Sequence, residues 1–426
     1  MHPLPHRRAA WRVFAIMAAL MAFDHLDRQI VASMFPFLKQ HWVLDDAQLG
    51  ALVSVVSVIV AVGTIPLSLL ADRWGQVRSL FAMAVIWSGA TIACAFATSY
   101  GELLVARAAI GVGEAAYGSV GCALLATLFP ARIRSTVLGA FLVAALVGSV
   151  AGLMLGGVVT QHWGWQAGFG VAGAPGLVLA VLFYAVARML PAAVPAGAAR
   201  RDGPRCGAVA VFVEIAKPRS APLACVGAGL QLVSVSAMYA WLPSFLHRQH
   251  GLASADAGLA AGFIVLAGVP GAIGFGFLAD RLTRRLPSAR YHLAAGAALL
   301  TALFTWAAFD FANDDRVRLW LLVLGAMTMP GIVGPVTAAI LEAVSPFARS
   351  TAAAVLAATQ NLFGLALGPI MIGLLSDRFG LETAMRVVPL FSGVACVFFI
   401  VAARTYPRDR ARVESGEPLA TLRLSA

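Results

Sequence analysis

Long apolar windows separated by short polar segments repeat along almost the whole chain. Each window is about 20 residues long, which at a rise of about 1.5 Å per residue lets a helix cross the hydrocarbon core of a bilayer. Strand edges would leave backbone groups unsatisfied in lipid, so we expect every window to be a helix. The predicted spans are twelve, at residues 13–36, 48–71, 79–98, 102–128, 136–160, 166–187, 222–246, 257–279, 291–309, 319–343, 350–375 and 387–403.

One interruption of this pattern is much longer than the others. The stretch from 191 to 222, PAAVPAGAARRDGPRCGAVAVFVEIAKPRSAP, is rich in Pro, Gly and Arg and separates six spans from six. Such composition is typical of a linker. The expected organisation is an N-terminal six-helix bundle at 1–190, a linker at 191–221, a C-terminal six-helix bundle at 222–405 and a tail at 406–426.

Composition identifies the solvent in which the chain folds. Hydrophobic residues make up 60% of the 426 residues and charged residues only 12%, with a mean hydropathy of +0.84. Soluble domains carry about a quarter charged residues, so this chain has too little polar surface to cover a soluble core of its size. The prediction is an all-α polytopic membrane protein, multi-pass in the cell inner (plasma) membrane, in contact with the lipid bilayer.

Lysine and arginine lie mostly on one side of the predicted spans. With both termini cytoplasmic, the inside segments hold 23 of these residues and the outside loops hold 6. Positive residues accumulate on the cytoplasmic side of membrane proteins, so we expect this orientation. The same bias accounts for the net charge of +11, which therefore gives no reason to expect a nucleic-acid partner.

The two halves repeat one another. LLADRWGQVRS follows the second span and GFLADRLTRR the eighth, while FPARIRST follows the fourth and SPFARST the tenth. Two matched motifs in the same order indicate a duplicated six-helix unit. Paired repeats of this kind form pseudo-symmetric bundles that transport by alternating access.

The repeated loop resembles the signature G-x-x-x-D-R-x-x-R-R of the major facilitator superfamily. The copy starting at Gly276 matches fully, whereas the first copy has Ser68 in place of the usual glycine. An aspartate at a helix end can accept from a neighbouring helix N-terminus and from nearby arginines, so we expect these loops to act as conformational latches. The alternative is that the charges only enforce topology. The expected latch residues are Asp72, Arg73, Arg78, Gly276, Asp280, Arg281 and Arg285.

Narrower motifs in spans one and four resemble the Spinster-like branch of that superfamily. HLDRQIVASMFPFLKQHW is similar to its first helix, which starts N-x-x-D-R, and ARAAIGVGEAAYG to its fourth, R-x-x-x-G-x-G-E-A. The departure is Asp24, where the branch usually has asparagine. The resemblance points to Asp27, Arg28 and Glu114 as functional positions.

These motifs bring costly charges into apolar helices. A charged side chain at mid-membrane costs about 2.5–3.5 kcal/mol on insertion scales, so it lines a cavity or pairs with another charge. On one helix Asp24 shares a face with Asp27 and Arg28. From the helical rise, Asp24 and Glu114 lie about 18 Å and Asp27 about 14 Å below the outer boundary, with Arg107 at about 8 Å. In the facilitator fold that the resemblance implies, the first and fourth helices both line the cavity, so we expect these groups to meet.

Three carboxyl groups beside two guanidinium groups cannot all stay ionised in low dielectric, so at least one is expected to hold a proton. Asp27 and Glu114 are the expected proton carriers, and Asp24 is either a second proton site or a neutral acid that imitates asparagine. Arg28 and Arg107 are the expected anion-binding or latch partners. The alternative is a permanent ion pair that joins the two spans. His25 is expected to be an ordinary helix-interface histidine.

The second half carries neutral polar groups in its spans instead of charges. Together with Tyr117, the residues expected to line a substrate cavity are Gln231, Ser234, Tyr239, Trp241, Gln360 and Asn361. An ionic half facing a neutral half suits a substrate with one anionic head and a hydrophobic or aromatic body. Alternatively, each of these polar residues only joins neighbouring helices.

The chain lacks the motifs that characterise several other classes of protein. With only two lysines, Lys39 and Lys217, there is no phosphate-binding GxxxxGK[ST] loop, and HExxH and CxxC patterns are absent. We expect no enzyme activity, no metal and no cofactor, with a proton gradient as the energy source. The predicted protein is a monomeric, proton-coupled secondary transporter for a small organic or amphiphilic anion, such as a lysolipid or an aromatic or sugar acid. The alternatives are a multidrug-type efflux carrier and a non-transporting receptor on the same scaffold.

Overall fold

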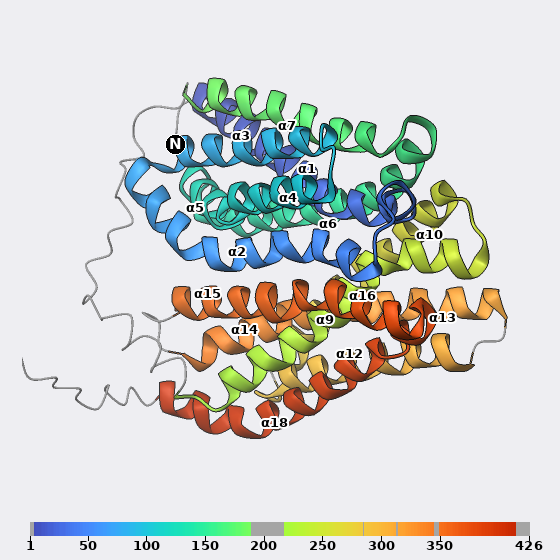
Figure 1. The fold of residues 1–426 in the computed structure, drawn as a ribbon. Coiled ribbons are helices and arrows are strands. Elements are labelled where there is room, and N and C mark those ends of the chain that lie inside the picture. Colours follow the sequence, from blue (N-terminus) through green and yellow to red (C-terminus); the bar gives the residue numbers. More distant parts are fainter. Residues whose placement is uncertain (1–3, 189–216, 284, 312–313, 345–348, 415–426) are drawn as a thin grey trace, which may run out of the picture. The chain divides into compact units, whose positions relative to one another are not determined.

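The structure, a computed structural model, describes residues 4–188, 217–283, 285–311, 314–344 and 349–414 (Figure 1). Within these ranges it is entirely helical, and twelve helices are long and apolar enough to cross a membrane. The predicted all-α class and the twelve spans are confirmed. The predicted linker at 191–221 lies mostly outside the described residues, as does the end of the tail.

Several spans consist of more than one helical segment. The first six spans are α1 (Leu4–Trp42), α2 (Asp46–Trp74), α3 (Gln76–Ala95), α4 with α5 (Tyr100–Glu114 and Tyr117–Leu128), α6 (Ala131–Trp163) and α7 (Trp165–Ala187). Spans seven to nine are α9 (Ser220–His250), α10 with α11 (Ser254–Leu266 and Gly268–Thr283), and α12 with η1 (Ala289–Trp306 and Ala307–Phe311). Span ten is α13, η2 and α14 (Asp315–Thr328, Met329–Ile332 and Val333–Ala343). Span eleven is α15, η3 and α16 (Arg349–Thr359, Gln360–Leu365 and Leu367–Phe379), and span twelve is α17 with α18 (Leu381–Met385 and Val388–Glu414).

The break between α4 and α5 falls directly after Glu114, at Ala115 and Ala116. Ala116 leaves helical geometry at φ −122° and ψ 3°. The Thr64 hydroxyl donates to the Ala115 carbonyl at 2.8 Å, and the Ser119 hydroxyl donates to the Ala116 carbonyl at 3.0 Å. The Ala116 carbonyl also accepts from the backbone N–H of Val120 at 3.0 Å. The Ala115 carbonyl, for which Thr64 replaces a helical partner, is thus satisfied inside the protein, which is the condition for tolerating a broken helix in lipid.

The chain divides into two compact units by internal contacts. Unit 1 comprises Met1–Arg201, Val235–Leu266 and Asn361–Val387, and unit 2 comprises Asp202–Ser234, Ala267–Gln360 and Val388–Ala426. Unit 1 therefore contains the first six spans together with parts of spans seven, eight, eleven and twelve. These units describe packing, and the division of the sequence into two six-helix bundles remains a prediction.

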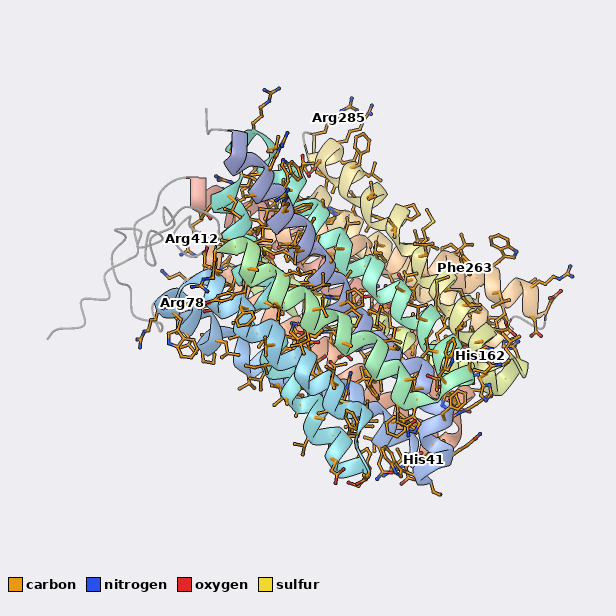
Figure 2. The ribbon with its side chains drawn as sticks, turned by 90° about the horizontal axis from the view of Figure 1, so that it is seen from above. His41, Arg78, His162, Phe263, Arg285 and Arg412 are labelled. Carbon is orange, nitrogen blue, oxygen red and sulfur yellow. The ribbon has the colours of Figure 1, made fainter. Side chains whose placement is uncertain are left out.

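Glycines hold α1 against α6 in unit 1. A β-carbon at Gly148 would collide with the carbonyl of Ala22, and one at Gly152 with the carbonyl of Leu26. The four-residue spacing places both glycines on one helix face, so the two backbones can approach closely. This packing fixes the rotation of α1 and therefore the direction in which its charged residues point. Figure 2 shows Arg78 near one end of this unit and His41 and His162 near the other.

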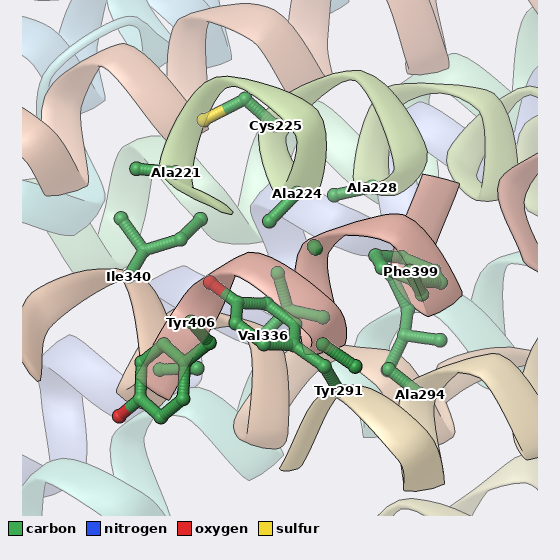
Figure 3. Close-up of a cluster of buried hydrophobic side chains, with 14 of the residues drawn as sticks. Ala221, Ala224, Cys225, Ala228, Tyr291, Ala294, Val336, Ile340, Phe399 and Tyr406 are labelled. Atoms are coloured by element: carbon green, nitrogen blue, oxygen red, sulfur yellow. The ribbon is translucent and has the colours of Figure 1, made fainter. Parts of the chain in front are cut away.

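Unit 2 has a core of small and aromatic side chains (Figure 3). The rings of Tyr291 and Tyr406 meet edge to face, with centroids 5.2 Å apart, and both side chains are fully buried. The Tyr406 hydroxyl donates to Glu342 Oε2 at 2.8 Å. Alanines such as Ala224 and Ala294 belong to the same cluster, and small residues of this kind let membrane helices approach closely.

Candidate functional site

A group of ionisable side chains lies in the middle of unit 1, on α1 and α4. We call it the mid-span charge cluster, and its members are Asp24, His25, Asp27, Arg28, Arg107 and Glu114. His25 is at the midpoint of the membrane span Arg8–Trp42. The structure thus brings spans one and four together at the depth expected from the sequence. Within the cluster the charges separate into two sets of contacts.

The first set is the Asp27–Arg107 pair. Arg107 Nη1 lies 3.3 Å from Asp27 Oδ2, and the exposed fractions of the two side chains are 1% and 0%. Arg107 also donates to the Asp27 carbonyl at 3.2 Å and to the Leu52 carbonyl on α2 at 3.1 Å. Three helices are joined by this one guanidinium. Because the pair is closed to water and bonded to backbone, its geometry fits a permanent connection between helices, the alternative left open by the sequence.

The second set contains Arg28 and Glu114. Arg28 Nη2 lies 2.7 Å from Glu114 Oε2, with side-chain exposed fractions of 17% and 0%. Arg28 Nε has no hydrogen-bond partner in the structure. Unlike Arg107, Arg28 is therefore partly accessible and keeps donor capacity that the protein does not use.

Asp24 links Glu114 to His25. The carboxyl groups of Asp24 and Glu114 lie within hydrogen-bonding reach of each other. An ionised carboxylate can only accept, so two carboxyl groups in contact form a hydrogen bond only if one of them carries a proton. On its other side, Asp24 Oδ2 lies 2.9 Å from His25 Nδ1. The expectation that His25 is an ordinary interface histidine stays a prediction, although the sequence did not indicate how close its ring lies to the neighbouring acid.

The neutral polar residues predicted to line a cavity on span seven are bonded to neighbouring helices in both units. Gln231 is buried in unit 2 and donates at 3.4 Å to Thr301 and to the Met329 carbonyl. Ser234, in the same unit, donates to the Val388 carbonyl at 3.0 Å. In unit 1, Trp241 Nε1 donates to the Pro369 carbonyl at 2.9 Å. These bonds connect neighbouring helices, as the alternative reading of such residues describes.

Other predicted cavity residues keep some exposure. Tyr239, Gln360 and Asn361 are half-buried. Tyr239 packs against a small apolar cluster of unit 1 that includes Leu153. Tyr117 is buried and its hydroxyl lies 3.3 Å from the Met17 carbonyl, to which it donates. The described residues contain no group of three or more His, Cys, Asp or Glu side chains placed to hold a metal ion.

The two latch motifs are described to different extents. The side chain of Asp72 lies outside the described part, while Arg73 and Arg78 are exposed. In the second copy Asp280 Oδ1 lies 3.7 Å from Arg290 Nη2, and Arg290 also pairs with Glu342. The remaining predicted members, Arg281 and Arg285, are exposed and Gly276 is half-buried. Arg290, on α12, is a partner that the motif alone did not indicate.

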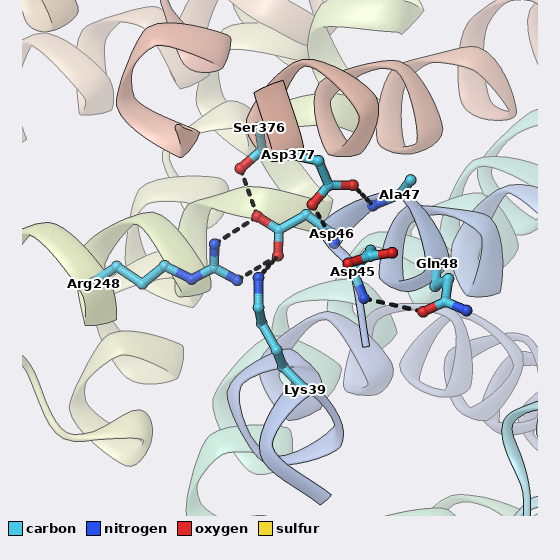
Figure 4. A network of polar contacts seen from close by, with 8 residues as sticks. All are labelled: Lys39, Asp45, Asp46, Ala47, Gln48, Arg248, Ser376 and Asp377. Carbon is cyan, nitrogen blue, oxygen red and sulfur yellow. Dashed lines mark hydrogen bonds and ion pairs between the residues drawn. The ribbon is translucent and has the colours of Figure 1, made fainter. Parts of the chain in front are cut away.

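A second ionic network was not predicted from the sequence. It lies at the ends of the helices that the charge count places outside, and we call it the outer cluster: Lys39, Asp46, Arg248, Ser376 and Asp377 (Figure 4).

Asp46 is the centre of the outer cluster. It receives Lys39 Nζ at 2.6 Å, both terminal nitrogens of Arg248 at 2.6 and 2.8 Å, and the Ser376 hydroxyl at 2.5 Å. Asp377 accepts from the backbone N–H groups of Asp46 and Ala47, both at 2.8 Å. Residues of α1, α2, α9 and α16 are thereby joined within unit 1. The carboxylate of Asp377 caps the first turn of α2, where the helix dipole favours negative charge.

One sequence signal was available for this network. LLSDRFG at 374–380 is nearly identical to LLADRWG at 69–75, the first copy of the latch motif. The aspartate of this additional copy, Asp377, accepts from the start of a neighbouring helix. That is the role expected for Asp72.

Comparison with known proteins gives a consistent family. The model of the Major Facilitator Superfamily matches residues 17–310. An MFS-type efflux pump of Mycolicibacterium smegmatis is 28% identical, over 94% of this chain and 94% of its own length. Protein spinster homolog 1 of Bos taurus is 28% identical over 86% of this chain and 73% of its own. The sphingosine-1-phosphate transporter SPNS2 of Danio rerio is 24% identical over 93% of this chain and 85% of its own.

A solved structure shares the fold. The crystal structure of a bacterial homolog of the human lysosomal transporter Spinster, inward-facing and unoccupied, matches with a TM-score of 0.80. The sequence identity is 21%, and the match covers 94% of this chain and 98% of the other.

The chain belongs to the Major Facilitator Superfamily, and it is a transporter embedded in the membrane. Proteins of the Spinster-like branch, whose motifs spans one and four resemble, are among its matches. It is a multi-pass protein of the inner membrane that acts on a small-molecule substrate.

Proposed function

We propose that this protein is a proton-coupled secondary transporter that moves a small organic or amphiphilic anion by alternating access. The observation that carries the proposal is the position of Glu114. Its carboxyl group lies between the Arg28 guanidinium and the Asp24 carboxyl group, and its side chain has no exposed surface.

This position couples a proton to an anion. While Glu114 is ionised, it neutralises Arg28, and the guanidinium is occupied. When Glu114 takes a proton, Arg28 loses its counterion and can bind the anionic group of a substrate. Arg28 is the group suited to this exchange, because 17% of its side chain is exposed and its Nε is unpartnered. Asp27 contributes less directly, since Arg107 already holds it.

The substrate class follows from the charges and from the relatives. Arg28 is a partly exposed cation, whereas Arg107, the other arginine of the mid-span charge cluster, is closed to water, so the site suits one anionic head on a hydrophobic body. The SPNS2 relative is named as a transporter of sphingosine-1-phosphate, an amphiphilic anion of this kind. A lysolipid-like anion is therefore the first candidate, and aromatic and sugar acids are the next.

The outer cluster supports alternating access. It ties α2 to α9 and α16 by charged contacts at the predicted outer ends of the helices. Charged pairs at the membrane boundary exchange their partners for water at low cost, so such contacts can close and open repeatedly. Transport would then require this cluster to separate in one state of the cycle.

The test is transport by the purified protein in liposomes with an imposed pH gradient, against a panel of lysophospholipids, aromatic acids and sugar acids. The wild type is expected to accumulate an anion only with the gradient. Glu114→Gln is expected to abolish this dependence while remaining folded, and Glu102→Gln, at an exposed position of the same helix, serves as the matched control. Wild-type pH dependence in Glu114→Gln would contradict the proposal, and saturable binding without flux would favour a receptor.

The second candidate is a multidrug-type efflux carrier. It is favoured by the similarity to the efflux pump of Mycolicibacterium smegmatis, which spans 94% of both chains. Cells that express the protein would then accumulate less of several unrelated lipophilic dyes, and Glu114→Gln would remove that protection. Selective transport of one anion class with no effect on dyes would exclude this candidate.

A further inference from the structure

Glu114 needs a path by which a proton reaches it. Its side chain has no exposed surface, and one of its two contacts, Arg28, keeps its own proton at all accessible pH values. The other contact is Asp24, whose side chain is 5% exposed. A proton that arrives from water through the protein's own groups must therefore pass through Asp24.

His25 is the group that joins Asp24 to water. Its Nδ1 lies 2.9 Å from Asp24 Oδ2, and 28% of its side chain is exposed. An imidazole can accept a proton on one nitrogen and release one from the other. Short distances thus connect a partly exposed imidazole to Asp24 and on to Glu114, and a small rotation of the ring would align its Nδ1, which makes no hydrogen bond in this structure.

The exposed surface of His25 lies on a polar face of α1. His25 shares one helix face with Arg28 and Gln29, at spacings of three and four residues, and all three are half-buried. They lie at the middle of the membrane span Arg8–Trp42. A stripe of three polar side chains at this depth is stable only where it borders water or protein.

We propose that His25 and Asp24 form a proton relay that loads and unloads Glu114. This inference rests on the proposed function, because it assigns the route to the same proton site. In one transfer, Nε2 of the neutral ring takes a proton from water and Nδ1 gives its proton to the Asp24 carboxylate. Asp24 then passes a proton to Glu114, so one proton enters and one arrives. The ring returns to its first tautomer by exchange with water.

The other charged and titratable groups around the relay do not offer a second route. Arg28 is a permanent cation, and the Asp27–Arg107 pair is closed to water. The hydroxyl of Tyr117, on α5, is engaged with the Met17 carbonyl. Asp24 is thus the acid through which the imidazole reaches Glu114, at the position where Spinster-like proteins usually have asparagine.

The relay is tested with the proton itself as the probe. Purified protein in lipid nanodiscs is subjected to a rapid pH jump, and the infrared band of protonated carboxyl groups is followed in time. The part of this band that disappears in Glu114→Gln is assigned to the carboxyl group of Glu114. In His25→Gln and Asp24→Asn, the Glu114 band is expected to appear about a hundredfold more slowly, which is the lower end of the range for a positioned acid–base group. The amplitude of the band is expected to stay the same. Added imidazole is expected to restore the rate in His25→Ala, and His162→Gln, at an exposed histidine near a helix end, is the control.

The outcomes separate the relay from the proton site. A Glu114 band that appears at the wild-type rate in His25→Gln overturns the relay and leaves the proposed function intact. If Glu114 is protonated slowly in His25→Ala and added imidazole does not restore the rate, His25 has only a structural role. That result also overturns the relay. A wild type without any pH-dependent carboxyl band overturns the relay and the proposed proton site together.

Discussion

Neutralising Asp46 should open the outer cluster. Asp46→Asn keeps the shape of the side chain but removes the charge that faces both nitrogens of Arg248 and Lys39. A hydrogen bond to a charged group contributes about 1.5–3 kcal/mol. Lys39 is 39% exposed and contributes less, whereas Arg248 is only 25% exposed. We therefore expect a loss of about 2 kcal/mol, which shifts the balance between closed and open states about thirtyfold.

The assay is electron–electron resonance spectroscopy with spin labels at Trp163→Cys and Phe379→Cys, after replacement of the 5 native cysteines. Both positions are exposed, at 69% and 62%, and lie at the ends of α6 and α16. The distance distribution should gain a longer component in Asp46→Asn. Asp45→Asn is the matched control, because Asp45 is the exposed neighbouring acid and Asn remains a good residue at a helix start.

A second substitution, at Arg248, tests whether Asp46 acts through its direct contact with this arginine. Arg248→Gln alone should give the same shift, and the double variant should give little more than either single one, because both remove the same contact. Identical distance distributions in the parent and in Asp46→Asn would refute the assignment of the outer cluster as a closing contact. Fully additive shifts would refute the direct pairing of Asp46 with Arg248.

Two further predictions concern the packing of unit 1. Arg107→Met leaves the Asp27 carboxyl group buried without its partner, so the free energy of unfolding should fall by about 3–5 kcal/mol. Thermal unfolding in detergent measures this loss. An unfolding midpoint equal to that of the exposed control Arg78→Met would contradict the prediction. Gly148→Leu places a side chain against the backbone of α1 and should cost more than about 3 kcal/mol. Gly139→Leu, where a β-carbon meets no atom within 4 Å, should leave the yield of folded protein unchanged, and equal yields for both leucine variants would show that the helices separate easily.

The fold and, apart from His25, the membership of the mid-span charge cluster were predictable from the sequence, because both depend on local periodicity. Apolar windows give the spans, and a rise of about 1.5 Å per residue places Asp24 and Glu114 at one depth. The partners inside the cluster were not predictable. They depend on the rotation of α1 and α4 about their axes, which Gly148 and the close approach of α6 help to set. That rotation turns Asp27 toward Arg107 and leaves Glu114 to Arg28 and Asp24.

The outer cluster was missed for a different reason. Its central contact joins Asp46 to Arg248, 202 positions away, and its helix cap joins Asp46 to Asp377, 331 positions away. Charges at the ends of membrane helices are expected for topology alone, so nothing local distinguishes Arg248 from an ordinary loop arginine. Only the third ADR-like motif, at Asp377, pointed to a special role.

The break after Glu114 has a mechanical consequence for the fourth span. Arg107 and Glu114 both precede the break, so α4 moves them as one rigid rod about 20 Å long, whose far end reaches the boundary at Tyr100. The non-helical backbone is confined to this break, where the Ala115 carbonyl accepts from the Thr64 hydroxyl and the Ala116 carbonyl is bonded into α5. Glu114 therefore lies next to the point at which the direction of the span can change. Any change of angle there would move the outer end of α4 much farther than Glu114 itself.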